Sequence, residues 1–195
     1  YEVVWEHQAK STLRQPFAQP GRWLILADAG GIGDALAAQI TALGETVTLV
    51  EPTATPAEAV AQLTAALQVD QQTAGPLRGI LYLGALTAPT ASLAAATVTD
   101  SLALLQASQE RHLTTLLQLL QTLVNAEKQA TSRLWVVTQG AQQLSPTEPV
   151  AVAQSALWGM GRVIALEHGE LWGGLLDVDP LAEALDSAHQ LQAEL

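Results

Sequence analysis

The residues best suited to chemistry lie in a glycine-rich turn, residues 27–33 (ADAGGIG). The turn joins a predicted buried strand at 22–28 to a predicted helix at 31–44, and a second strand is predicted at 46–51. A strand, a glycine-rich turn, a helix and a strand in this order are typical of the opening of a dinucleotide-binding unit. There the glycines allow a sharp turn, close approach of a pyrophosphate and close helix–strand contact.

The turn departs from a working nucleotide loop in two ways. Ala27 stands at the first glycine of the pattern G-x-x-x-G-x-G, and only Gly31 and Gly33 match the last two glycines. Asp28 adds a carboxylate where phosphates would lie, and like charges repel. We therefore predict that Gly31 and Gly33 serve close helix–strand packing. The degenerate loop (Ala27, Gly30, Gly31, Gly33) is predicted to bind no cofactor.

The position after the second predicted strand leaves one alternative open. Glu51 follows that strand and is able to bond a ribose hydroxyl, so the position does not exclude NAD. A cofactor with a 2′-phosphate would require Arg or Lys there instead. Hydride transfer in such folds commonly uses a Tyr and a Lys four residues apart, and neither Tyr1 nor Tyr82 is followed by Lys at that distance. The sequence predicts no reductase chemistry in this chain.

Two other groups of polar residues favour structural roles. His168 lies between Glu167 and Glu170, but no second histidine follows at a metal-ligand spacing, so we predict a structural or surface role. Asp177 and Asp179 lie two residues apart at a predicted strand end, which places both side chains on one face. They form either a carboxylate pair or, as is more common, a strand terminus whose Asp caps the next helix.

Apolar runs alternate with helix-periodic segments along the chain. The predicted strands are 22–28, 46–51, 78–86, 133–139 and 173–179, and the predicted helices are 31–44, 55–68, 98–126, 149–167 and 180–195. The second of these helices has Thr55 as its expected N-cap and Pro56 at its first position. This alternation predicts an α/β fold, a Rossmann-like doubly wound, mostly parallel sheet with helices on both faces.

Composition limits the class of protein. The 195 residues carry a net charge of −11 and include no cysteine, and 49% of them are hydrophobic. The negative charge argues against nucleic-acid or membrane partners, and the lack of cysteine excludes disulfides and thiolate metal sites. We expect no metal, a cytoplasmic location and one domain: an N-terminal strand and linker at 1–20, a core at 21–179 and a C-terminal linker helix at 180–195.

The most specific segment is "SALWGMGRVIALEHGELWGGLLDVDP", residues 155–180. It resembles the structural subdomain of modular polyketide synthase ketoreductases, with Ala-Leu-Trp-Gly-x-Gly-Arg-Val leading into Glu-His-Pro-x-Leu-Trp-Gly-Gly and Asp-x-Asp-Pro. Gly169 replaces the usual proline. The opening "YEVVWE" and the degenerate loop agree with the same subdomain, so the resemblance covers nearly the whole chain.

This resemblance implies a truncated Rossmann-like half that is not an enzyme alone. It would brace a downstream catalytic half that binds NADPH, and space neighbouring domains such as dehydratase, methyltransferase, enoylreductase or acyl carrier protein. The alternatives are a stand-alone pseudo-ketoreductase scaffold and a fragment of an NAD(P)-dependent short-chain oxidoreductase.

The segment also supplies the candidate interface residues. Tryptophans provide large apolar bodies with one donor each, mid-helix glycines need something close to them, and an Arg–Glu pair forms charge-assisted bonds. For Trp158 in particular, an interface and an ordinary core position remain equal alternatives. The candidate interface or structural residues are Trp158, Gly159, Gly161, Arg162, Glu167, His168 and Trp172.

Overall fold

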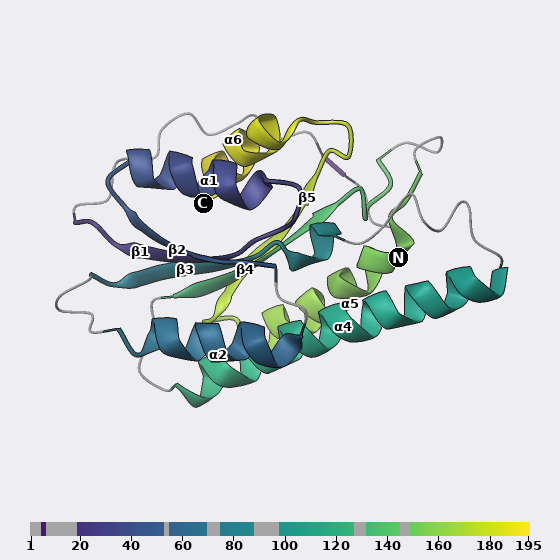
Figure 1. Cartoon of the computed structure of the whole chain (residues 1–195), viewed down its shortest axis with the longest axis horizontal. Coiled ribbons are helices and arrows are strands. Elements are labelled where there is room, and N and C mark those ends of the chain that lie inside the picture. The colour runs from purple at the N-terminus through teal and green to yellow at the C-terminus, as the bar shows by residue number, and fades with distance from the viewer. Residues whose placement is uncertain are drawn as a thin grey trace.

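A computed structural model gives the fold and describes residues 5–6, 19–52, 55–69, 75–87, 98–126, 132–144 and 149–195. One parallel sheet has the strand order β2-β1-β3-β4-β5 (Figure 1). Its strands are β1 (Arg22–Leu26), β2 (Thr46–Val50), β3 (Leu77–Tyr82), β4 (Arg133–Gln139) and β5 (Trp172–Val178). The predicted doubly wound α/β fold is confirmed. Of the N-terminal strand predicted within residues 1–20, most lies outside the described residues.

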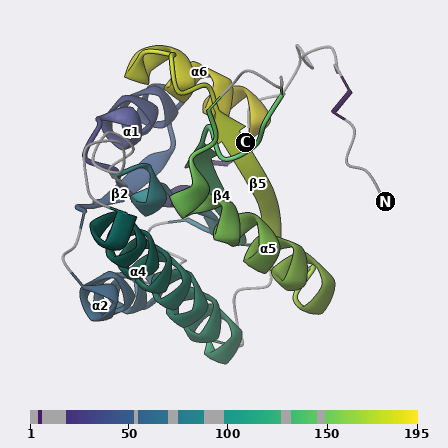
Figure 2. The ribbon, with the colours of Figure 1, turned by 90° about the vertical axis from the view of Figure 1, so that its right-hand side faces the viewer.

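Helices cover both faces of the sheet (Figures 1 and 2). On one face lie α1 (Ile32–Ala42) and α6 (Ala184–Glu194), and on the other lie α2 (Pro56–Leu67), α4 (Val98–Asn125) and α5 (Val152–Glu167). A short 3₁₀ helix, η1 (Gly84–Thr87), follows β3. The segment predicted as a C-terminal linker helix forms α6, which packs against α1 and the sheet.

Alternation along the strands separates two apolar cores. In β1, Leu24 and Leu26 face α2, α4 and α5, whereas Trp23 and Ile25 face α1 and α6. All four side chains are at most 5% exposed, as expected for a parallel strand covered on both faces. Within the described residues, no helix is both long and apolar enough to cross a membrane.

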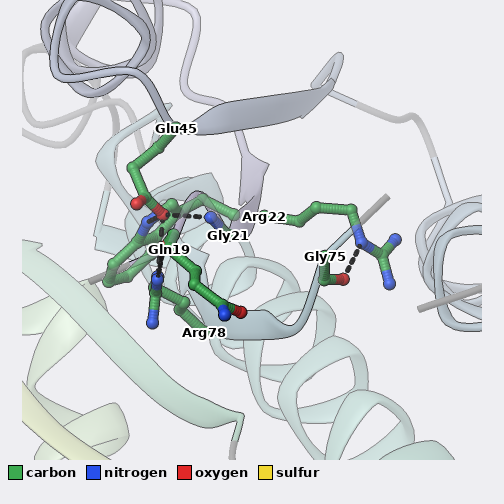
Figure 3. A network of polar contacts seen from close by, with 7 residues as sticks. Gln19, Gly21, Arg22, Glu45, Gly75 and Arg78 are labelled. Carbon is green, nitrogen blue, oxygen red and sulfur yellow. Dashed lines mark hydrogen bonds and ion pairs between the residues drawn. The ribbon is translucent and has the colours of Figure 1, made fainter. Parts of the chain in front are cut away.

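The amino edge of the sheet is held by one carboxylate. Glu45, just before β2, is buried, and its Oε2 accepts bonds from the Gly21 amide at 3.1 Å and the Trp23 indole at 3.2 Å (Figure 3). The same oxygen forms an ion pair with Arg78 Nε of β3 at 2.9 Å. Charge-assisted bonds of this kind are stronger than neutral ones, so Glu45 ties β1 to β3.

Arg22 binds carbonyl oxygens on the other side of the same edge. Its buried guanidinium donates to Gly75 at 3.0 Å, to Ala66 at 3.2 Å and to Val69 at 3.5 Å. Ala66 and Val69 lie at the C-terminal end of α2, where unpaired carbonyls and the helix dipole favour a cation. Arg22 therefore caps α2 from the neighbouring strand. At its other end α2 begins as predicted, with Thr55 as N-cap in a capping box with Glu58 and Pro56 at the first position.

Candidate functional site

Nucleotides in this class of fold bind at the carboxyl edge of the sheet, where β1 leads into α1. Here that position is taken by the carboxylate of Asp28, which is 4% exposed. Its Oδ1 accepts the amide N–H of Gly33 at 2.7 Å. Its Oδ2 accepts the amides of Gly30 at 2.8 Å and Ile32 at 3.3 Å.

These three bonds place a negative charge at the amino end of α1. A helix N-terminus offers unpaired N–H groups and a partial positive charge, which make it an anion-binding site. Asp28 provides the anion from within the chain. A phosphate would therefore have to displace a buried carboxylate that already accepts three hydrogen bonds. The turn as folded does not fit a pyrophosphate.

The glycines of the turn have separate roles. A methyl group on Gly33 would lie 3.1 Å from the Cβ of Ala27, so Gly33 allows the close helix–strand contact that was predicted. Around Gly31 the space is open, and its φ of +88° is the reason for glycine there. The prediction of a packing role is therefore wrong for Gly31, which serves the backbone turn.

Among the described residues, a cavity of about 30 Å³ lies in the crevice between β1 and β3, where strand order reverses. This cavity has room for a water molecule or two but not for an adenosine. Its lining includes Ala27, Glu51, Tyr82, Arg111 and His112. The NAD alternative that Glu51 left open would need space that these side chains occupy.

Tyr82 and His112 form a buried pair beneath this crevice. The Tyr82 hydroxyl lies 2.9 Å from Nδ1 of His112, and the residues are 3% and 4% exposed. Burial, reinforced by the positive charge of Arg111, lowers the pKa of His112 to about 4. Burial raises the pKa of Tyr82, against smaller opposite effects of Thr115 and Arg111. Both side chains are therefore neutral at physiological pH.

The sequence did not predict the contact between Tyr82 and His112, because β3 and α4 are far apart along the chain. One signal was available: His112, Leu116 and Leu119 share one helical face and are all buried. That spacing indicates a histidine facing the sheet.

The carboxyl ends of β4 and β5 are joined by a second polar network. Trp158 Nε1 donates to Thr138 Oγ1 at 2.9 Å, and that hydroxyl donates to Asp177 Oδ1 at 2.7 Å. Asp177 also accepts the amides of Ala141 at 3.0 Å and Gln142 at 2.9 Å. Asp177 therefore fixes the loop after β4 and is not half of a carboxylate pair.

Asp179 has a different partner from Asp177 and does not cap α6. It accepts the Leu181 amide at 2.8 Å, and the N-cap of α6 is Glu183. The predicted helix-capping role is therefore wrong for this pair. The described residues contain no group of three or more His, Asp or Glu that could hold a metal ion.

Two side chains four residues apart on α5 face the end of β4. Gln154, 1% exposed, accepts the Gln139 amide at 2.9 Å, and Trp158 bonds to Thr138. Neither an amide nor an indole exchanges a proton at neutral pH. This pair therefore holds α5 against β4 and does not provide an acid or a base.

The candidate interface residues lie on different sides of α5. A methyl group on Gly161 would lie 2.7 Å from Leu175 Cδ1 and 3.0 Å from the Trp172 ring, so this glycine lets α5 approach β5. A methyl group on Gly159 would meet nothing within 4 Å. Trp158 is half-buried, and its ring makes an edge contact with Trp5 at a centroid distance of 5.8 Å.

The charged candidates lie on the surface. Arg162 and Glu167 are exposed, and neither side chain makes a hydrogen bond or ion pair to another described residue. The charge-assisted bonds expected of them are thus not made within that part of the chain. His168 is the C-cap of α5 and is partly exposed, with its Nδ1 3.8 Å from Glu170 Oε1.

The parallel sheet, covered by helices on both faces, defines a Rossmann-like α/β domain. The family model for the Rossmann fold domain of polyketide synthase extender module SpnB matches residues 4–195, and the chain belongs to this family. Pikromycin polyketide synthase component PikAII of Streptomyces venezuelae is 49% identical over 70 residues, which is 33% of this chain and 2% of that protein. Polyketide synthase GfsA of Streptomyces halstedii is 49% identical over 63 residues, 32% of this chain and 1% of that protein.

Solved structures of ketoreductases are similar in fold to this chain. A C2-type ketoreductase from a modular polyketide synthase has a TM-score of 0.60 and 26% identity, covering 97% of this chain and 37% of the ketoreductase. The first ketoreductase of the tylosin synthase has a TM-score of 0.60 and 27% identity, covering 89% and 34%. The chain thus spans about a third of these ketoreductases and a small part of the synthases.

Replacing Asp28 by alanine removes the anion at the start of α1. We expect Asp28→Ala to lower the free energy of unfolding by about 1–3 kcal/mol, because three amides, those of Ile32 and Gly33 buried among them, lose their acceptor. Asp34→Ala, an exposed change in the same first turn, should cost about 0.5 kcal/mol or less. Urea unfolding measures both, and equal losses would contradict the capping role.

The buried histidine makes stability depend on pH. The folded chain keeps His112 neutral down to about pH 4, whereas the unfolded chain binds a proton from about 6.5. Stability from this group is therefore complete above pH 6.5 and falls as the pH drops to 4, by an amount on the order of 3 kcal/mol.

His112→Gln should flatten this part of the profile in urea unfolding measured from pH 4 to 7. His189→Gln, which changes an exposed histidine, should leave the profile as it is. An unchanged profile in the first variant would contradict the buried neutral state.

Proposed function

We propose that this chain is the non-catalytic structural subdomain of a polyketide synthase ketoreductase region. It binds no nucleotide, braces a catalytic half that binds NADPH, and spaces neighbouring domains of the synthase. The observation that carries this proposal is the Asp28 carboxylate bound at the amino end of α1. The small cavity at the strand crossover and the Gln154–Trp158 pair give further support.

The outer face of α5 is a suitable surface for the brace. Val152, Gly159, Val163 and Leu166 share one side of the helix, and all four are exposed. Leu166 is 87% exposed, and such apolar faces commonly mark sites of contact with another domain. A glycine with open space around it would let a second helix come close at Gly159.

The same geometry also fits a pseudo-ketoreductase scaffold in a module without ketoreduction. In that case α5 would contact a different neighbouring domain, while the carboxyl edge would stay equally closed. The two functions differ in the partner and agree on the absence of cofactor binding.

Titration with NADPH and NADH tests the first part of the proposal. By calorimetry, we expect no binding tighter than about 1 mM, which corresponds to about −4 kcal/mol. Saturable binding in the micromolar range, abolished by a bulky substitution at Gly33, would contradict the proposal and favour an oxidoreductase fragment.

Two matched glycine substitutions test whether the outer face of α5 is free to contact another domain while its inner face packs against β5. In this chain alone, Gly159→Ala should stabilise by about 0.5–1 kcal/mol, because alanine favours the helix and its methyl group meets nothing. Gly161→Ala should destabilise by about 1–3 kcal/mol, because its methyl group strikes Leu175.

The larger change Gly159→Leu should keep the chain folded and weaken its association with a ketoreductase catalytic half, measured by co-purification and calorimetry. Unchanged association would remove Gly159 from the interface without affecting the conclusion about nucleotide binding.

A further inference from the structure

A second cavity lies at the amino edge of the sheet, away from the edge where nucleotides bind in this class of fold. Its volume is about 310 Å³, compared with about 30 Å³ for the cavity beside Tyr82. Its lining includes residues of β1, β3 and β4 together with Leu195, which follows α6. Pockets for small molecules begin at about 300 Å³, so this cavity is large enough for a small organic ligand.

Two tryptophans give the cavity apolar walls. Trp23 of β1 and Trp135 of β4 lie on the face of the sheet that α1 and α6 cover. Glycines of neighbouring strands leave room for both rings, because a methyl group on Gly79 would lie 2.4 Å from the Trp23 ring and one on Gly173 would lie 2.5 Å from the Trp135 ring. Indole rings present broad flat surfaces that favour contact with other flat apolar groups.

Two arginines line the same cavity, and their charges have different surroundings. Arg78 forms an ion pair with Glu45 at 2.9 Å, so its charge is largely balanced (Figure 3). Arg133 is exposed and donates from Nη1 to the carbonyl oxygen of Trp172 at 3.1 Å. Among the described residues, no carboxylate forms an ion pair with Arg133. Its positive charge is therefore not balanced by that part of the chain.

The strand register places this cation next to the aromatic walls. Gly79 of β3 pairs with Trp23 on one side and with Arg133 on the other. Arg133 and Trp135 lie two residues apart on β4, so their side chains leave the same face of the sheet. Because Gly79 has no side chain, the Trp23 ring lies over it, between β1 and the strand of Arg133. One cation and two indole rings therefore line the same hollow.

We propose that this cavity is a binding site for a small carboxylate with a flat apolar body, such as an aryl carboxylic acid. Arg133 would bind the carboxylate through the planar fork of its guanidinium, and the two indoles would contact the ring system. The single unbalanced cation and the net charge of −11 favour a monoanion over a phosphate ester. The site lies at the opposite edge from the Asp28 turn, so it is independent of whether the chain binds a nucleotide.

The test titrates the isotope-labelled chain with 2-naphthoate and, separately, with its uncharged analogue 2-naphthamide, followed by NMR. We expect saturable binding of 2-naphthoate with a dissociation constant of about 1 mM or lower. The indole N–H signals of Trp23 and Trp135 should shift, whereas that of Trp158, on α5, should not. The amide has the same ring but no charge for Arg133, so it should bind about tenfold more weakly.

Two arginine variants provide the matched control. Arg133→Gln should weaken 2-naphthoate about tenfold and leave 2-naphthamide unchanged. Arg162→Gln removes the same charge from the exposed surface of α5 and should leave both affinities unchanged. Both arginines are exposed, so both variants should fold.

Four results would each overturn the proposal. These are equal affinities for the two ligands, equal losses in the two variants, shifts at Trp158 or at the Gly33 amide in place of Trp23 and Trp135, and no saturable binding. The last result is expected if another part of the chain fills the cavity.

Discussion

A helix that starts directly after a parallel strand points its first amide N–H groups at the edge of the sheet, and those groups need an acceptor. In a nucleotide-binding domain a phosphate fills this need. In this domain Asp28 fills it, within a few residues of the helix it caps. The close contact between Ala27 and Gly33 and the positive φ of Gly31 follow from the same tight turn. The geometry of the turn from β1 into α1 depends on this one carboxylate.

Contacts within the chain therefore fix the loops at both the carboxyl ends and the amino ends of the strands. At the carboxyl edge, Asp28 and Asp177 bind loop amides, and at the amino edge Glu45 and Arg22 join the ends of strands and of α2. Asp28, Glu45 and Arg22 are buried, and buried charges are tolerated only when they are paired or hydrogen-bonded.

Much of the fold was readable from the sequence, because buried parallel strands and helices have distinct periods. The strand predicted at 133–139 agrees with β4 to the residue, and the helix predicted from Thr55 begins there. The tail predicted as a helix from 180 begins only at Ala184, because Asp179 forms a local turn first. The Tyr82–His112 pair and the Glu45 network join distant segments, so no local pattern predicts them. The carboxylate of Asp28 in the turn was visible in the sequence, but its capping bonds to the amides of Gly30 and Gly33 required the folded turn.

Under the proposed function, the capping of α1 by Asp28 makes the stability of this domain independent of the concentration of any cofactor. A domain that takes its anion from a dissolved cofactor gains stability as that cofactor becomes more concentrated, and loses it as the cofactor is consumed. An acceptor attached covalently next to its donors has no such dependence. The sheet and the helices that cover it would therefore be equally stable at low and at high cofactor concentration.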